Sequence, residues 1–107
     1  MVRPVLFIAD SDRAEREGLA SALERRFGAD YEVTTAAAGT AALDALERLA
    51  AAGRDIALIA AYAWLPEVDG SSLLQRAHGL HPGARRILVV DVGDMRVMEP
   101  LHRGMAL

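Results

Sequence analysis

The sequence contains no cysteine, which removes disulfide bonds, thiolate metal sites and thiol nucleophiles from consideration. The same absence fits a reducing cytosol, where we expect this chain to reside. Aromatic residues make up only 5% of the chain, so aliphatic side chains must fill its core. No apolar run approaches the ~20 residues of a membrane-spanning helix, and the N-terminus lacks a signal-peptide pattern. We therefore expect no membrane contact.

An excess of basic charge is also missing. The formal net charge is -3, whereas a nucleic-acid-binding domain needs a basic patch that replaces phosphate counterions. The arginine pairs at 25–26 and 85–86 are typical of solvated surface. We expect no nucleic-acid partner, and the length of 107 residues suits a single domain over residues 1–107.

Short apolar runs alternate with amphipathic stretches along the chain. Strands are expected at residues 5–9, 31–35, 56–61 and 86–90, and helices at 12–27, 39–53 and 71–80, with a weak helix at 94–105. Strands that alternate with helices of this length indicate a parallel sheet with right-handed crossovers.

The first helix carries the clearest local signals. Asp12 is the expected N-cap, and Glu15 three residues later would complete a capping box. Gly28 marks the end of the helix. One stripe of the helix is apolar and is expected to face the sheet: Leu19, Ala22, Leu23 and Phe27.

Polar residues follow the predicted strands at the edge where open parallel sheets bind ligands. Asp10, Ser11 and Asp12 follow the first predicted strand, residues 62–64 follow the third, beginning with Tyr62, and Asp91 follows the fourth. The first junction contains no glycine, so neither a dinucleotide fingerprint nor a phosphate-cradling loop is present.

These residues resemble the receiver domain of bacterial two-component response regulators. The likeness rests on Ile8-Ala-Asp-Ser-Asp12, on the loop Leu65-Pro-Glu-Val-Asp-Gly70, and on Ile87-Leu-Val-Val-Asp91, in that order and spacing. It implies a flavodoxin-like, three-layer α/β/α fold with parallel sheet order 2-1-3-4. Receiver domains have a fifth strand, for which this sequence shows no counterpart. We therefore expect a C-terminally truncated receiver-like domain whose fifth strand is missing or supplied by a partner.

The resemblance also implies a phosphorylation site, and the sequence departs from it. A receiver holds Mg²⁺ with two acids after the first strand; Asp10 matches one, but Ser11 stands in place of the other. Tyr62 stands where the acceptor aspartate belongs, and Asp91 occupies the position of a Ser or Thr hydroxyl. The lysine that follows the fifth strand has no counterpart.

Tyr62 cannot replace the acceptor, because a phenol with a pKa near ~10 gives a stable ester and not a labile acyl phosphate. Asp10 and Asp91 are weak candidates for a cation, since a ligand of the usual hard-oxygen site is missing. We expect no cofactor, no specific Mg²⁺ site and no enzymatic activity.

Three further residue types have a structural and a functional interpretation. Asp69 before Gly70 is typical of a turn and helix cap. His78 and His81 have a spacing compatible with zinc, but no third ligand is evident, which favours surface histidines. Trp64 either packs over the loop and shields the altered pocket, or anchors an interface.

The sequence therefore favours a phosphorylation-independent signalling module that acts through protein contacts. Candidate interface residues are Trp64, together with Ile87 and Val89 on an uncovered strand edge, and a homodimer is one form of contact. The partner is another protein or a missing C-terminal domain of the same chain, since the sequence also resembles receiver-like modules fused to thioredoxin-reductase-like flavoproteins. The alternatives are a small-molecule sensor with a pocket around Asp10, Tyr62 and Asp91, and an active Mg²⁺-dependent receiver.

Overall fold

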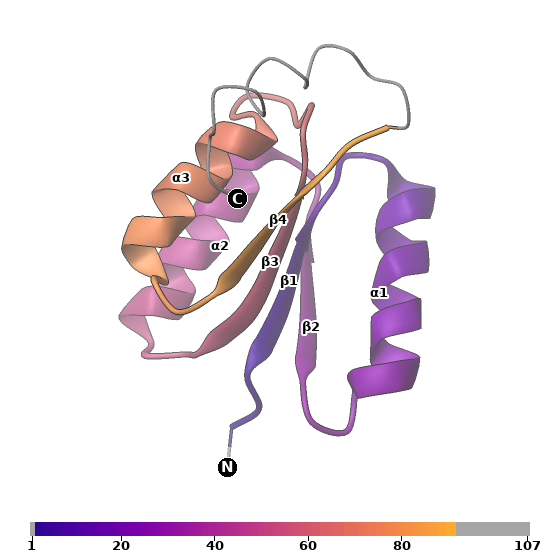
Figure 1. The fold of residues 1–107 in the computed structure, drawn as a ribbon, viewed down its shortest axis with the longest axis vertical. Helices are drawn as coiled ribbons and strands as arrows, with labels where there is room; N and C mark the ends of the chain where they lie inside the picture. Colours follow the sequence, from indigo (N-terminus) through magenta and orange to yellow (C-terminus); the bar gives the residue numbers. More distant parts are fainter. Residues whose placement is uncertain (1, 92–107) are drawn as a thin grey trace.

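Residues 2–91 of the computed structural model are described, and strands and helices alternate along them. The strands are β1 (Val5–Ala9), β2 (Glu32–Ala36), β3 (Ile56–Tyr62) and β4 (Arg85–Val89); the helices are α1 (Arg13–Phe27), α2 (Gly39–Ala51) and α3 (Gly70–Leu80). The sheet order is β2-β1-β3-β4 and all neighbours are parallel (Figure 1). The predicted fold and order are confirmed. The weak helix predicted at 94–105 lies outside the described residues.

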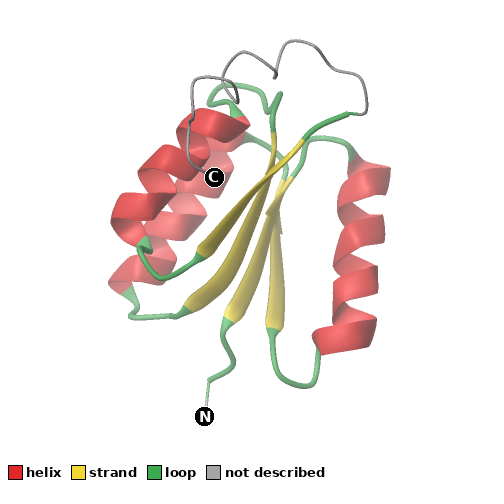
Figure 2. Ribbon diagram, in the orientation of Figure 1, coloured by secondary structure: helices red, strands yellow, loops and turns green. Residues whose placement is uncertain are grey.

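The helices divide between the two faces of the sheet because crossovers between parallel strands are right-handed. The step from β1 to β2 runs one way across the sheet, and the steps to β3 and then β4 run the other way. As a result, α1 covers one face, and α2 and α3 cover the other (Figure 2). None of these three helices has the length and apolar character needed to cross a bilayer.

The main core lies on the face that α2 and α3 cover. Phe7 of β1 and Ile59 of β3 are paired in register, and both are fully buried. Leu46 of α2 and Leu73 of α3 pack in the same cluster and are equally buried. Each such side chain contributes roughly 1.5–3 kcal/mol through its removal from water.

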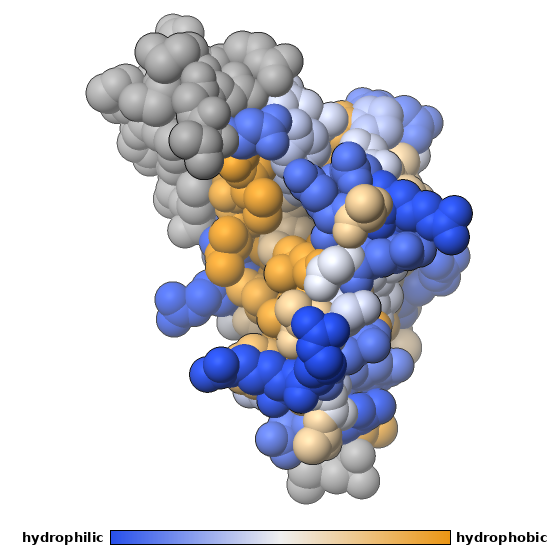
Figure 3. All heavy atoms as spheres, turned by 90° about the vertical axis from the view of Figure 1, so that its right-hand side faces the viewer, coloured by the Kyte–Doolittle hydropathy of each residue, from blue (hydrophilic) through white to orange (hydrophobic). Residues whose placement is uncertain are grey.

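The face under α1 is covered less completely than the sequence predicted. Leu19 and Phe27 of the predicted apolar stripe are 39% and 38% exposed, and α1 has no buried residue. Leu23 and Phe27 of the stripe face the sheet, where they line a groove with Leu6 and Leu58, but the stripe is only partly buried (Figure 3). The reason is geometric: α1 is the only described helix on this face, so its flank beside the sheet lacks a neighbouring helix.

The ends of the helices are set by side chains that the sequence identifies. The Asp12 carboxylate accepts a hydrogen bond from the Glu15 N–H at 2.9 Å, which confirms the N-cap. In a capping box the Glu15 side chain would accept a hydrogen bond from the Asp12 N–H. Instead, the Asp12 N–H donates to Oδ1 of Asp10. At the other end, the Gly28 N–H donates to Glu24 O, as expected of a helix end.

His81 is buried, which corrects the prediction that both histidines of the His78–His81 pair lie on the surface. Only 7% of His81 is exposed, and its Nε2 lies 2.8 Å from the Leu46 carbonyl oxygen. This contact joins the end of α3 to α2. His78 is exposed, as predicted.

Candidate functional site

Tyr62 and Asp91 meet at the carboxyl edge of the sheet. The Tyr62 hydroxyl donates a hydrogen bond of 2.6 Å to Oδ2 of Asp91. The backbone brings the two together, because Tyr62 pairs with Val89 in register and the Ala63 N–H donates to Val89 O. A phenol from the central strand β3 is thus held by a carboxylate that follows β4.

The loop after β3 is clamped against the end of that strand. The Gly70 N–H donates to Ala63 O at 3.0 Å, and a Cβ at Gly70 would lie 2.3 Å from Tyr62 O. Glycine is therefore required where α3 starts against β3. Asp69 caps α3 by accepting from the Ser72 N–H at 2.8 Å, which confirms its predicted role.

Asp10 lies beside this site but is engaged locally. It is 7% exposed, and its carboxylate accepts the Asp12 N–H at 2.9 Å. Its carbonyl oxygen accepts a hydrogen bond of 2.9 Å from the Arg16 guanidinium. Ser11, the next residue, is exposed. The structure therefore places the first predicted acid at the carboxyl edge, inside a turn that its own side chain stabilises.

Glu15 lies close enough to Asp10, Asp12 and Asp91 for their charges to act on it. The sequence had indicated only a helix-capping role for Glu15. The neighbouring Asp10 carboxylate raises the pKa of Glu15, and Asp12, partial desolvation and Asp91 raise it further. Asp91 is remote in sequence, so only the folded sheet reveals this repulsion. The available signal was the position of Glu15 in the first helical turn after β1.

A magnesium ion of the kind that receivers hold would meet carboxylates at Asp10 and Asp91 at this edge, but no carboxylate at Ser11. The Asp10 carboxylate already accepts a backbone N–H, and the Asp91 carboxylate already accepts the Tyr62 hydroxyl. A hydroxyl at Ser11 is a poorer Mg²⁺ ligand than a carboxylate. Within residues 2–91, no three Asp, Glu, His or Cys side chains are placed to hold a metal ion together.

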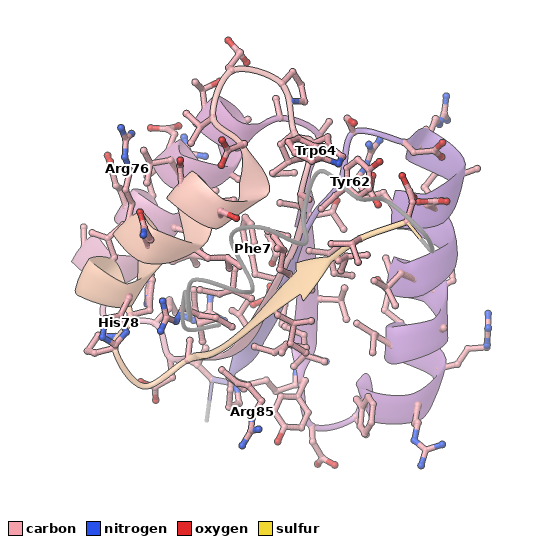
Figure 4. The ribbon with its side chains drawn as sticks, turned by 45° about the horizontal axis from the view of Figure 1, so that its top comes forward. Phe7, Tyr62, Trp64, Arg76, His78 and Arg85 are labelled. Atoms are coloured by element: carbon pink, nitrogen blue, oxygen red, sulfur yellow. The ribbon has the colours of Figure 1, made fainter. Side chains whose placement is uncertain are left out.

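The candidate interface residues lie on two different parts of the molecule. Trp64 is half-buried and lies at the same end of the sheet as Tyr62 (Figure 4). Ile87 is 42% exposed and Val89 is half-buried on β4, which is an edge strand among the described residues.

Comparison with solved structures identifies the family. The signal receiver domain of an HD-domain-containing protein from Pseudomonas fluorescens is 30% identical, with a TM-score of 0.70, over 92% of this chain and 72% of that one. The chain belongs to the response-regulator receiver family. A CheY-like receiver domain protein from Methanospirillum hungatei is 27% identical, with a TM-score of 0.73, over 96% of this chain and 77% of the other.

A third structure contains a receiver bound to other components. It is the CheX–CheY–BeF₃–Mg²⁺ complex from Borrelia burgdorferi, at 19% identity and a TM-score of 0.68, over 94% of this receiver domain and 72% of the matched chain. At that identity the likeness shows the fold alone. No family model matches the sequence, and no curated protein matches it either.

Proposed function

We propose that this receiver domain signals without phosphorylation, as a non-enzymatic module that acts through contacts with protein partners. The observation that carries the proposal is the 2.6 Å hydrogen bond between the Tyr62 hydroxyl and the Asp91 carboxylate. The two bonded side chains stand at the positions that a phosphorylated receiver uses for its acceptor aspartate and its hydroxyl residue.

Two chemical arguments support this interpretation. An acyl phosphate needs a carboxylate nucleophile, and Tyr62 offers a phenol whose ordinary pKa is near ~10. A transferred phosphoryl group would meet the Asp91 carboxylate, with a like charge, instead of a neutral hydroxyl.

Protein contact is the activity that we propose for such a module. The related Borrelia complex unites a receiver with a second protein, CheX. For this chain the partner is a separate protein or another domain of the same polypeptide.

A titration with beryllofluoride and Mg²⁺, a mimic of the phosphoryl group, tests the proposal. We expect amide resonances of residues 10–12, 62–64 and 91 to be unchanged in two-dimensional NMR spectra, whereas a phosphorylatable receiver measured in parallel responds. Saturable shifts at Asp10, Tyr62 and Asp91 would instead support an active receiver.

A small-molecule sensor is the second candidate. Asp10, Tyr62 and Asp91 bring two carboxylates and a phenol to the sheet edge where α/β domains bind ligands. A thermal-shift screen against metabolites tests it. A ligand that stabilises the wild type, and that loses its effect in Tyr62→Ala, would favour a sensor over a contact module.

A further inference from the structure

A pocket of about 590 Å³ lies at the amino end of the sheet, where α3 ends and β4 begins. It is lined by the turn at residues 82–84, by Ala57 of β3, and by the basic side chains of His78, Arg85 and Arg86. Figure 4 shows His78 and Arg85 close to this turn, at the end of the molecule opposite to the candidate site described above. None of the residues that line this basic pocket carries a carboxylate.

The two arginines of the basic pocket are not neutralised by the rest of the described structure. Within residues 2–91, neither Arg85 nor Arg86 forms an ion pair with an acidic side chain. Arg86 is half-buried, and its Nη1 donates a hydrogen bond of 3.3 Å to Leu74 O, which holds the guanidinium beside α3. Arg85 is exposed. Two full positive charges are therefore left to a ligand that carries negative charge.

The kinds of side chain in the basic pocket suit a phosphate group. A planar guanidinium donates parallel N–H bonds to phosphate oxygens and keeps its charge throughout the physiological pH range. His78, in the last turn of α3, adds a ring N–H donor. The C-terminus of α3 brings a partial negative charge of about one half to this corner, but the two guanidinium charges outweigh it. The pocket therefore favours an anion over a neutral or cationic ligand.

The basic surface is too short for a polyanion. An adjoining pocket of about 340 Å³ shares residues 82–84 and is lined by Arg54 and Asp55. The charge of Arg54 is already paired, since its Nη2 lies 2.5 Å from Oε2 of Glu32, and Asp55 adds an exposed carboxylate. A nucleic acid or a strongly acidic peptide needs a longer series of cationic contacts. A single phosphate group needs only the side chains present, and the basic pocket has the volume typical of a small-molecule site, about 300–1,000 Å³.

We propose that the basic pocket binds the phosphate group of a small phosphorylated metabolite, with Arg85 and Arg86 as its charged ligands and His78 as a further donor. Tyr62 and Asp91 lie at the opposite end of the sheet. The basic pocket is therefore separate from the altered phosphorylation site and from the sensor pocket considered above. It gives a binding role to the arginine pair that the sequence pattern assigned to solvated surface.

An NMR titration of the whole 107-residue chain at constant ionic strength tests the proposal. The probes are glycerol 3-phosphate and adenosine monophosphate, and the controls are glycerol and adenosine, which lack the phosphate. We expect saturable shifts of the amide resonances of Ala57, Gly83 and Arg85 with at least one ester and none with the controls. Inorganic phosphate serves as a third ligand. Shifts with inorganic phosphate and with neither ester would indicate an adventitious ion only, and would overturn the proposal.

Two variants locate the site. Arg85→Ala removes one charge at an exposed position and should weaken ester binding by about threefold to tenfold. Gly83→Asp places a carboxylate in the lining of the pocket, where a Cβ has no other atom within 4 Å, and should weaken binding at least as much without unfolding the chain. Arg76→Ala is the matched control, because this exposed arginine of α3 does not line the pocket. Its affinity for the esters should equal that of the wild type.

Unchanged ester binding in both Arg85→Ala and Gly83→Asp, each with a native spectrum, would overturn the proposal. So would an absence of saturable shifts up to about 10 mM ester, or shifts that map only to the carboxyl edge of the sheet. Tighter binding of a hexaglutamate peptide or of oligothymidylate than of either ester would assign the pocket to an acidic protein segment or to a nucleic acid instead. The beryllofluoride titration answers the question of phosphorylation independently of these results.

Discussion

The Tyr62 hydroxyl and the Asp91 carboxylate form a 2.6 Å hydrogen bond across the carboxyl ends of β3 and β4. We predict that Tyr62→Phe lowers the free energy of unfolding by about 0.5–1.5 kcal/mol, toward the low end because the pair is exposed. Urea denaturation of Tyr62→Phe, Asp91→Ala and the double variant measures this. These variants form a double-mutant cycle. A coupling energy of zero between Tyr62 and Asp91 in this cycle would show that the hydrogen bond contributes nothing to stability.

Glu15 makes the stability of the domain depend on pH. Asp10, Asp12, partial desolvation and Asp91 together raise its pKa in the folded state above that of the unfolded chain. A carboxyl group with a raised folded pKa contributes stability below its unfolded pKa and loses that contribution as the pH rises through the folded value. We therefore expect Glu15→Gln to be more stable than the wild type at neutral pH.

The stability difference between Glu15→Gln and the wild type should vanish as the pH falls through the raised folded-state pKa of Glu15 into the ordinary range of a glutamate. Thermal unfolding from pH 7 to about pH 3.5 tests this. Glu47→Gln, at an exposed position of α2, serves as the matched control. A Glu15→Gln difference that is constant over this range would contradict the explanation.

Gly70 should tolerate no side chain. A Cβ there would meet the Tyr62 backbone oxygen at 2.3 Å, so Gly70→Ala must displace α3 or the end of β3. We expect a loss of about 1–3 kcal/mol. Gly79→Ala in the same helix has open space around its Cβ and should stabilise the domain by about 0.5–1 kcal/mol. Equal effects of the two substitutions in denaturant titrations would refute the steric argument.

His81 should contribute to stability through its contact with the Leu46 carbonyl oxygen. His81→Ala removes this hydrogen bond and the packing of the buried imidazole, and we expect a loss of about 1–3 kcal/mol. His78→Ala, at an exposed position in the last turn of α3, should change stability by less than about 0.5 kcal/mol. Comparable losses in the two variants would show that burial of His81 has no special role.

The fold was predictable from the sequence because its signals are local. The apolar run at residues 5–9 and the caps Asp12 and Asp69 define strand and helix ends without reference to distant residues. The order of the strands followed from the resemblance to receivers. The proximity of Tyr62 and Asp91 was predictable too, since both lie at the carboxyl ends of neighbouring parallel strands.

Features that depend on neighbours from other elements were not predictable. The stripe at Leu19 and Phe27 has the spacing of a buried face, but no second described helix lies beside it. His81 follows α3 in a sequence context typical of a surface turn, yet α2 covers it. The repulsion between Glu15 and Asp91 arises only once the sheet has assembled.

Incubation with acetyl phosphate and Mg²⁺, followed by intact-mass measurement, tests the central claim most directly. The phenol of Tyr62 occupies the place of the acceptor carboxylate, so we predict an unchanged mass for the wild-type chain, while a phosphorylatable receiver in the same buffer gains a phosphoryl group. A phosphoryl adduct on the wild type that maps to Asp10, Tyr62 or Asp91 would contradict the account.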